Sequence, residues 1–186
     1  MLLPHQLGVG VPGAAEAVVH HTRQWKQAVE AGSDESVLLL DFTNAFNSID
    51  RSSMLQAIRD MCPDFYNYAA FCYGSHTLLR GHAFSIPSAC GTQQGDACGP
   101  LFFAVSVHKM VLQSAEHLRW AKWYLDDGNL CGTHASLQHA LGVISSEGAK
   151  VGLHLNLNKC KLWGRFPPSM EFAQSRSVPF VPPRVG

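Results

Sequence analysis

The chain has 186 residues, of which 46% are hydrophobic and 15% are charged, and its 14 basic residues are balanced by 14 acidic ones. This length and hydrophobic content exclude a disordered, collagen-like or coiled-coil protein and suit one ordinary domain. The balanced charge gives the chain no overall attraction to a polyanion such as nucleic acid.

Neither a membrane span nor a secretory signal is visible in the sequence. Its longest apolar runs are far shorter than the roughly 20 residues of a membrane-spanning helix, and the N-terminus lacks a basic start followed by an apolar core. The six cysteines show no CxxC spacing, which favours reduced, mostly buried thiols. We therefore expect a soluble, intracellular protein, either nuclear or cytoplasmic, with no membrane partner.

Apolar periodicity, together with glycine and proline positions, predicts the secondary structure in chain order. Helices are expected over residues 14–31, 48–61, 63–73, 101–118 and 136–151. A buried strand is expected at 36–42, hairpins at 77–86 and 120–131, and a strand or strand pair at 155–163. A glycine-punctuated loop covers 90–100.

The order strand, helices, hairpin, helix, strand is the split βαββαβ pattern, which predicts an α+β fold. Such a ferredoxin-like fold is an antiparallel sheet with helices on one face. Five prolines follow Arg165, so we expect residues 166–186 to form an extended or disordered tail and residues 1–165 to form the domain.

Three carboxylates occupy the ends of predicted strands. Asp41 ends the apolar run of residues 37–40, and Asp126 and Asp127 follow residues 123–125. A carboxylate at the end of a buried strand is costly unless something compensates its charge, and Mg²⁺ prefers such oxygen ligands. We expect these carboxylates to converge within a few Å at one sheet edge as a two-metal site. Taken alone, however, Asp-Asp-Gly is also a common hairpin turn.

Four segments in order resemble the catalytic motifs of reverse transcriptases. Residues 41–49 resemble the first motif, 91–102 the template-and-nucleotide loop, 124–127 the Y-x-D-D box, and 152–160 the fourth motif. Residues 6–10 resemble the segment that precedes the first motif in the enzymes of non-LTR retrotransposons. The resemblance implies a polymerase palm with part of the fingers, whose remaining fingers and thumb segments are missing from this chain.

The resemblance also implies the roles of the acids and of a lysine. Asp41 and Asp126 would hold two Mg²⁺ ions, for which Mn²⁺ is an alternative, with Asp127 nearby and the carbonyl of Phe42 assisting. Lys159 would donate a proton to the departing pyrophosphate, and Lys161 competes for this role.

Three further residues would contact the incoming nucleotide. Phe46 occupies the position whose ring blocks a ribose 2′-hydroxyl in this family, although an ordinary core phenylalanine is the alternative. Gln94 and Gly95 would let the backbone approach the nucleotide, and a simple surface loop is the alternative there.

The function implied is an RNA-directed DNA polymerase that adds dNTPs to a DNA primer on an RNA template. Two readings of other classes remain open. One is a catalytically idle or truncated palm that serves as a binding module or has no function. The other is a different two-metal enzyme, an RNA polymerase or a nuclease. Phe46 and the Y-x-D-D box both argue against this second alternative.

Overall fold

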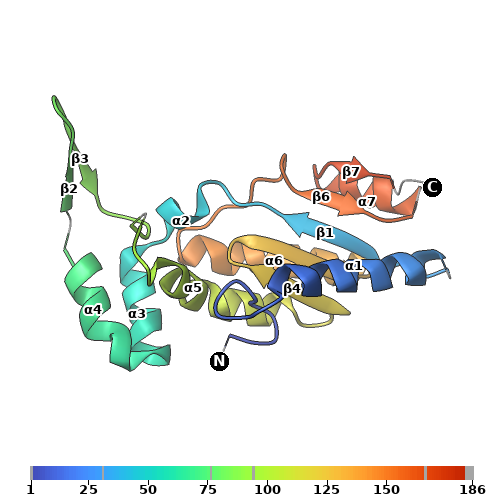
Figure 1. The fold of residues 1–186 in the computed structure, drawn as a ribbon. Helices are drawn as coiled ribbons and strands as arrows, with labels where there is room; N and C mark the ends of the chain where they lie inside the picture. Colours follow the sequence, from blue (N-terminus) through green and yellow to red (C-terminus); the bar gives the residue numbers. More distant parts are fainter. Residues whose placement is uncertain (1, 31, 76, 94, 166, 183–186) are drawn as a thin grey trace.

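A computed structural model gives the fold of residues 2–30, 32–75, 77–93, 95–165 and 167–182 (Figure 1). Its helices are α1 (Ala14–Glu30), α2 (Ala45–Ser48), α3 (Arg51–Met61), α4 (Pro63–Tyr73), α5 (Gly99–Ser114), α6 (His134–Lys150) and α7 (Pro168–Ser175). Its strands are β1 (Ser36–Leu40), β2 (Thr77–Arg80), β3 (Ser85–Ser88), β4 (Trp120–Tyr124), β5 (Asp127–Gly132), β6 (Lys161–Trp163) and β7 (Phe180–Val181). In this part of the chain, none of the helices is long and apolar enough to cross a membrane.

The central sheet has the strand order β4-β5-β1-β6-β7. Strand β1 lies in the middle and pairs antiparallel with β5 on one side and β6 on the other. The first four strands of this order reproduce the ferredoxin-like arrangement, which confirms the α+β, split βαββαβ prediction. Strand β7 extends the sheet by pairing in parallel with β6.

Both faces of the sheet are covered, which corrects the expectation of helices on one face only. Leu38 and Leu40 of β1 are buried in the larger core with side chains of α5 and α6. Val37 points to the opposite face, where it packs in a smaller core with Trp25 of α1. Because successive strand residues face opposite sides, the apolar run of residues 37–40 in β1 is that of a strand buried on both faces.

A smaller lobe projects from the sheet and consists of α3, α4 and the β2–β3 hairpin (Figure 1). Asp50 caps α3, because its carboxylate accepts a hydrogen bond from the N–H of Ser53 at 2.8 Å. This bond is the main cause that lowers the pKa of Asp50. The helix expected at 48–61 is therefore α3, which begins after this cap at Arg51, and Ser48 ends the separate short helix α2.

The C-terminal segment is folded, so the prediction of an extended or disordered tail over 166–186 is wrong for the described residues 167–182. Pro167 and Pro168 stand at the start of α7, where proline costs no hydrogen bond. Ala173 and Val178 are buried in the larger core, and β7 joins the sheet. Apolar contacts therefore outweigh the proline content. The strand or strand pair expected over 155–163 consists of β6, which spans only Lys161–Trp163, and an isolated antiparallel bridge between Leu155 and Phe42.

Candidate active site

Antiparallel pairing of β1 with β5 brings the three predicted catalytic acids to one edge. Leu40 lies opposite Gly128, so the residues next along each strand are Asp41 and Asp127. Asp126 is the second residue of the two-residue turn that joins β4 to β5, and Asp127 is the first residue of β5. Continuing the strand alternation places Asp41 and Asp127 on the face opposite α5 and α6.

The electrostatics of this edge favour a cation. One carboxylate oxygen of Asp41, Oδ1, is buried and has no hydrogen-bond partner. Burial, together with the charges of Asp127 and Asp41, raises the pKa of Asp126. Burial and the charge of Asp41 likewise raise the pKa of Asp127. An unpaired buried carboxylate oxygen beside two further destabilised carboxylates fits the oxygen-ligand chemistry of Mg²⁺ or Mn²⁺.

The carboxylate oxygens of Asp41, Asp126 and Asp127 do not all lie within 4.8 Å of one another, so the three acids are less close than expected. Among the described residues, the group whose ligand atoms all lie within 4.8 Å of one another is a different one, the exposed Glu116, His117 and His139. Three like charges repel one another, so a closer approach of the acids requires a compensating cation.

The fourth motif is joined to the first by backbone hydrogen bonds. The N–H of Asn156 donates to the Asp41 carbonyl at 2.8 Å, and the N–H of Thr43 donates to the His154 carbonyl at 2.9 Å. The Phe42 carbonyl takes no part in these two bonds, and the Phe42 ring is buried in the larger core.

The two candidate lysines occupy different positions near this connection. Lys159 is exposed in the turn that follows Asn156, whereas Lys161 lies on β6 opposite Leu39. Lys161 alternates with the buried Leu162, so it belongs to the sheet face that α1 covers. Lys161 therefore shares the sheet face of Asp41, whereas Lys159 lies in the turn after Asn156, whose N–H bonds to the Asp41 carbonyl.

Phe46 is half-buried in α2 and stacks on Phe103 of α5, with ring centroids 4.3 Å apart and ring planes 14° apart. Its carbonyl accepts a hydrogen bond from the N–H of Thr92 at 2.9 Å. The first motif and the nucleotide loop are therefore in direct contact, and the Phe46 ring packs on the core at the edge of this contact.

The nucleotide loop is held by an aspartate that sequence reasoning left without a role. Asp96 accepts hydrogen bonds from the hydroxyl of Tyr73 at 2.5 Å and from the N–H of Cys98 at 2.9 Å. Gly95 has φ +90°, a left-handed conformation that side chains rarely adopt, so glycine is needed here for its backbone. Gln94 lies outside the described residues.

Arg51 is a second residue whose role the sequence did not reveal. Its guanidinium is buried and donates to the Gly91 carbonyl at 3.0 Å, to the Ser88 carbonyl at 2.6 Å and to the Ser88 hydroxyl at 2.9 Å. It also lies 5.3 Å from the centre of the Tyr73 ring. An arginine in a polar helix segment normally extends into solvent, and only these tertiary contacts distinguish it.

Replacing Arg51 with Met removes the guanidinium and leaves two partly buried carbonyls without their donors. We expect the free energy of unfolding to fall by about 2–4 kcal/mol, since each bond to a charged donor contributes about 1.5–3 kcal/mol. Urea denaturation measures this loss. Arg59→Met on the same helix is the matched control, because Arg59 is exposed and contacts Tyr66 at the surface. Equal effects of the two variants would contradict the role of Arg51.

The raised pKa of Asp126 predicts a pH-dependent gain of stability on mutation. The folded state binds the proton more tightly than the unfolded state, so the ionised carboxyl destabilises the fold once the pH rises above its unfolded value. Without divalent cations, Asp126→Asn should therefore be more stable than the wild type at pH 7. This gain should vanish as the pH falls below about 3.8, where both states are protonated. Chemical denaturation with EDTA present tests this, and the exposed Asp34→Asn should show no such gain.

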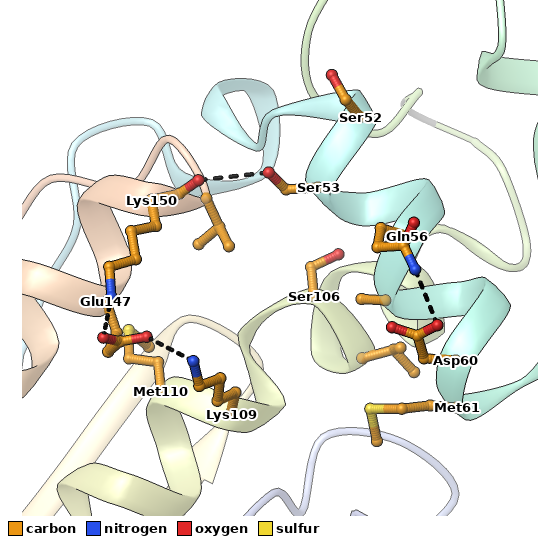
Figure 2. A pocket seen from close by; sticks show the side chains of 13 residues that line it. Ser52, Ser53, Gln56, Asp60, Met61, Ser106, Lys109, Met110, Glu147 and Lys150 are labelled. Atoms are coloured by element: carbon orange, nitrogen blue, oxygen red, sulfur yellow. Dashed lines mark hydrogen bonds and ion pairs between the residues drawn. The ribbon is translucent and has the colours of Figure 1, made fainter.

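A pocket of about 530 Å³ lies elsewhere, between α3, α5 and α6 (Figure 2). Figure 2 shows Glu147 between Lys109 and Lys150, with which it forms ion pairs. The Ser53 hydroxyl donates to the Lys150 carbonyl at 3.3 Å. The predicted catalytic and nucleotide-binding residues are absent from its lining, so this pocket is separate from the acidic edge.

Comparison with known proteins identifies the family of this chain. Residues 10–180 match the family model described as reverse transcriptase (RNA-dependent DNA polymerase). A Retrovirus-related Pol polyprotein from type-1 retrotransposable element R2 of Bradysia coprophila is 28% identical over 149 residues, which cover 73% of this chain and 17% of that protein.

The fold is similar to that of apo telomerase from Candida tropicalis, truncated from its C-terminal domain. The TM-score is 0.65 at 11% identity, over 88% of this chain and 37% of that one. The chain thus spans less than half the length of either protein. Since the family match covers nearly all of its residues, including the β1, β4 and β5 segments that carry the acids, this chain belongs to the reverse transcriptase (RNA-dependent DNA polymerase) family.

Proposed function

We propose that this chain is the palm, with part of the fingers, of an RNA-directed DNA polymerase that adds dNTPs to a primer 3′-hydroxyl. The observation that carries the proposal is the acidic edge, where Asp41 stands beside Asp126 and Asp127 with one buried carboxylate oxygen unpartnered. An RNA template, a DNA primer and a dNTP would be its partners.

Asp41, Asp126 and Asp127, with the Phe42 carbonyl, would hold two divalent cations, Mg²⁺ or Mn²⁺. Such cations lower the pKa of the attacking hydroxyl and neutralise the triphosphate. The fold of the chain would position the acids and the nucleotide loop for this reaction. The β1–β5 pairing holds the acids together, and the bond from Thr92 to the Phe46 carbonyl holds the nucleotide loop beside them.

The remaining roles follow from the same arrangement. The Phe46 ring would exclude a ribose 2′-hydroxyl, and Gln94 and Gly95 would contact the nucleotide from the loop that Asp96 anchors. Lys159 would donate a proton to the departing pyrophosphate from the segment bonded to Asp41.

Primer extension tests the proposal in two proteins. We expect the 186-residue chain alone to extend an RNA-templated DNA primer very weakly or not at all, because positioning of the reactants supplies much of the catalysis. We expect a palm chimera, in which this chain replaces the aligned residues of the R2 Pol polyprotein, to extend the primer in a Mg²⁺-dependent reaction.

Robust extension by the isolated chain would contradict the first expectation. A folded palm chimera that binds template and primer but incorporates no dNTP would support an idle palm and contradict the proposed activity. Incorporation of NTPs in preference to dNTPs would indicate an RNA polymerase.

A further inference from the structure

A buried glutamine near the N-terminus contacts the turn that carries the catalytic acids. Gln6 is only 1% exposed. Its side-chain oxygen accepts hydrogen bonds from the N–H of Leu125 at 2.8 Å and of Gly8 at 3.0 Å. Its side-chain nitrogen donates to the Leu125 carbonyl at 3.1 Å. Both backbone polar groups of Leu125 are therefore bonded to one side chain.

Leu125 needs this support because of its conformation. It has φ 56°, in the left-handed region that a leucine rarely adopts. Tight hairpin turns usually place Asn, Asp or Gly at such a position. Tyr124 pairs with Asp127 across the turn, so Leu125 and Asp126 alone reverse the chain direction. A change in the Leu125 backbone would consequently move the Asp126 carboxylate.

The backbone around Gln6 is fixed against the same hairpin. The N–H of Trp123 donates to the His5 carbonyl at 2.7 Å, and the N–H of Leu7 donates to the Trp123 carbonyl at 2.7 Å. A Cβ atom on Gly8 would lie 2.7 Å from the Leu125 nitrogen, so only glycine permits this approach. Figure 1 shows this N-terminal stretch, in dark blue, beside β4.

We infer that Gln6 is a positioning residue, whose amide holds the left-handed Leu125 and thereby fixes the turn that presents Asp126 and Asp127. The inference rests on the proposed function for the metal-binding role of Asp126. It also explains residues 6–10 physically, because Gln6 bonds to Leu125 of the Y-x-D-D turn and Gly8 packs closely against it.

Amide hydrogen exchange of the metal-free chain tests the contact itself. Gln6→Leu removes all three hydrogen bonds at similar size, and the protection of the Leu125 amide should fall about tenfold or more as the turn opens locally. Gln6→Glu keeps the acceptor oxygen but loses the donor to the Leu125 carbonyl, so its protection should be intermediate. Unchanged protection of Leu125 in Gln6→Leu would overturn the inference.

Mn²⁺ affinity, measured by electron paramagnetic resonance on the same chain, tests the consequence. Gln6→Leu should weaken the Asp126-dependent binding of Mn²⁺ about 10- to 100-fold, the range seen when a residue that orients a metal ligand is lost. Ser36→Ala is the matched control. It removes buried hydrogen bonds to Ser169 and His134 at the far end of β1, and should leave this affinity unchanged.

The two measurements separate the two claims. If the wild type does not bind Mn²⁺, or if Asp126→Asn binds it equally well, the proposed function fails, whatever the result for Gln6→Leu. If that binding exists and Gln6→Leu leaves its affinity unchanged, or if Ser36→Ala weakens it equally, the positioning role is overturned.

Discussion

Asp126→Asn in the palm chimera is expected to reduce the incorporation of dNTPs and NTPs together to background. The substitution preserves size but removes a negative charge that the divalent cations require. The loss should exceed about 10²–10³-fold, which is the usual cost of one electrostatic group in such a site. Single-nucleotide primer extension with a time course measures it.

Stability makes this result interpretable. The same substitution should stabilise the metal-free protein at pH 7, because it removes a half-buried charge, so the loss of activity cannot be ascribed to unfolding. Asp34→Asn, at an exposed position, should retain full activity. Residual activity of Asp126→Asn near the wild-type level would refute the assignment of Asp126 as a metal ligand.

Phe46→Val is expected to change the choice of sugar rather than the rate of DNA synthesis. The half-buried ring stacks on Phe103, so its replacement by a smaller side chain opens room for a 2′-hydroxyl. We expect the dNTP-to-NTP preference of the palm chimera to fall about 10- to 200-fold, the range that shape discrimination in an apolar pocket provides. The dNTP rate should fall less, because Phe46 holds no metal.

Phe172→Val is the matched control for this prediction. Phe172 of α7 is also half-buried. Its ring stacks on the ring of His134 of α6, with centroids 4.8 Å apart. It should lose stability without losing sugar selectivity. If Phe46→Val leaves the preference unchanged, Phe46 serves core packing only.

The elements that position the acids could be predicted from the sequence because their signals are local. The apolar run before Asp41 predicts a buried strand, and the segment around Asp126 and Asp127 predicts a hairpin. Their order specifies the split βαββαβ topology, and this topology brings Asp41 beside Asp127.

The features that the sequence did not reveal depend on partners distant in the chain. Arg51 looks like an ordinary surface residue, and the resemblance of residues 6–10 gives Gln6 no role, until residues 88–91 and Leu125 are placed against them. The apolar side of α1 predicts a helix, but it does not identify the sheet face that Trp25 covers. The C-terminal prolines suggested disorder, whereas two of them start a helix whose Ala173 is buried.

If the proposed function holds, Asp41, Asp126 and Asp127 together bind divalent cations. The most direct measurement is anomalous X-ray diffraction at the manganese edge from crystals of the chain soaked in Mn²⁺. We predict an anomalous peak between the carboxylates of Asp41 and Asp126, about 2.2 Å from an oxygen of each, that is lost in Asp126→Asn. A peak at Glu116, His117 and His139 with none between Asp41 and Asp126 would contradict it.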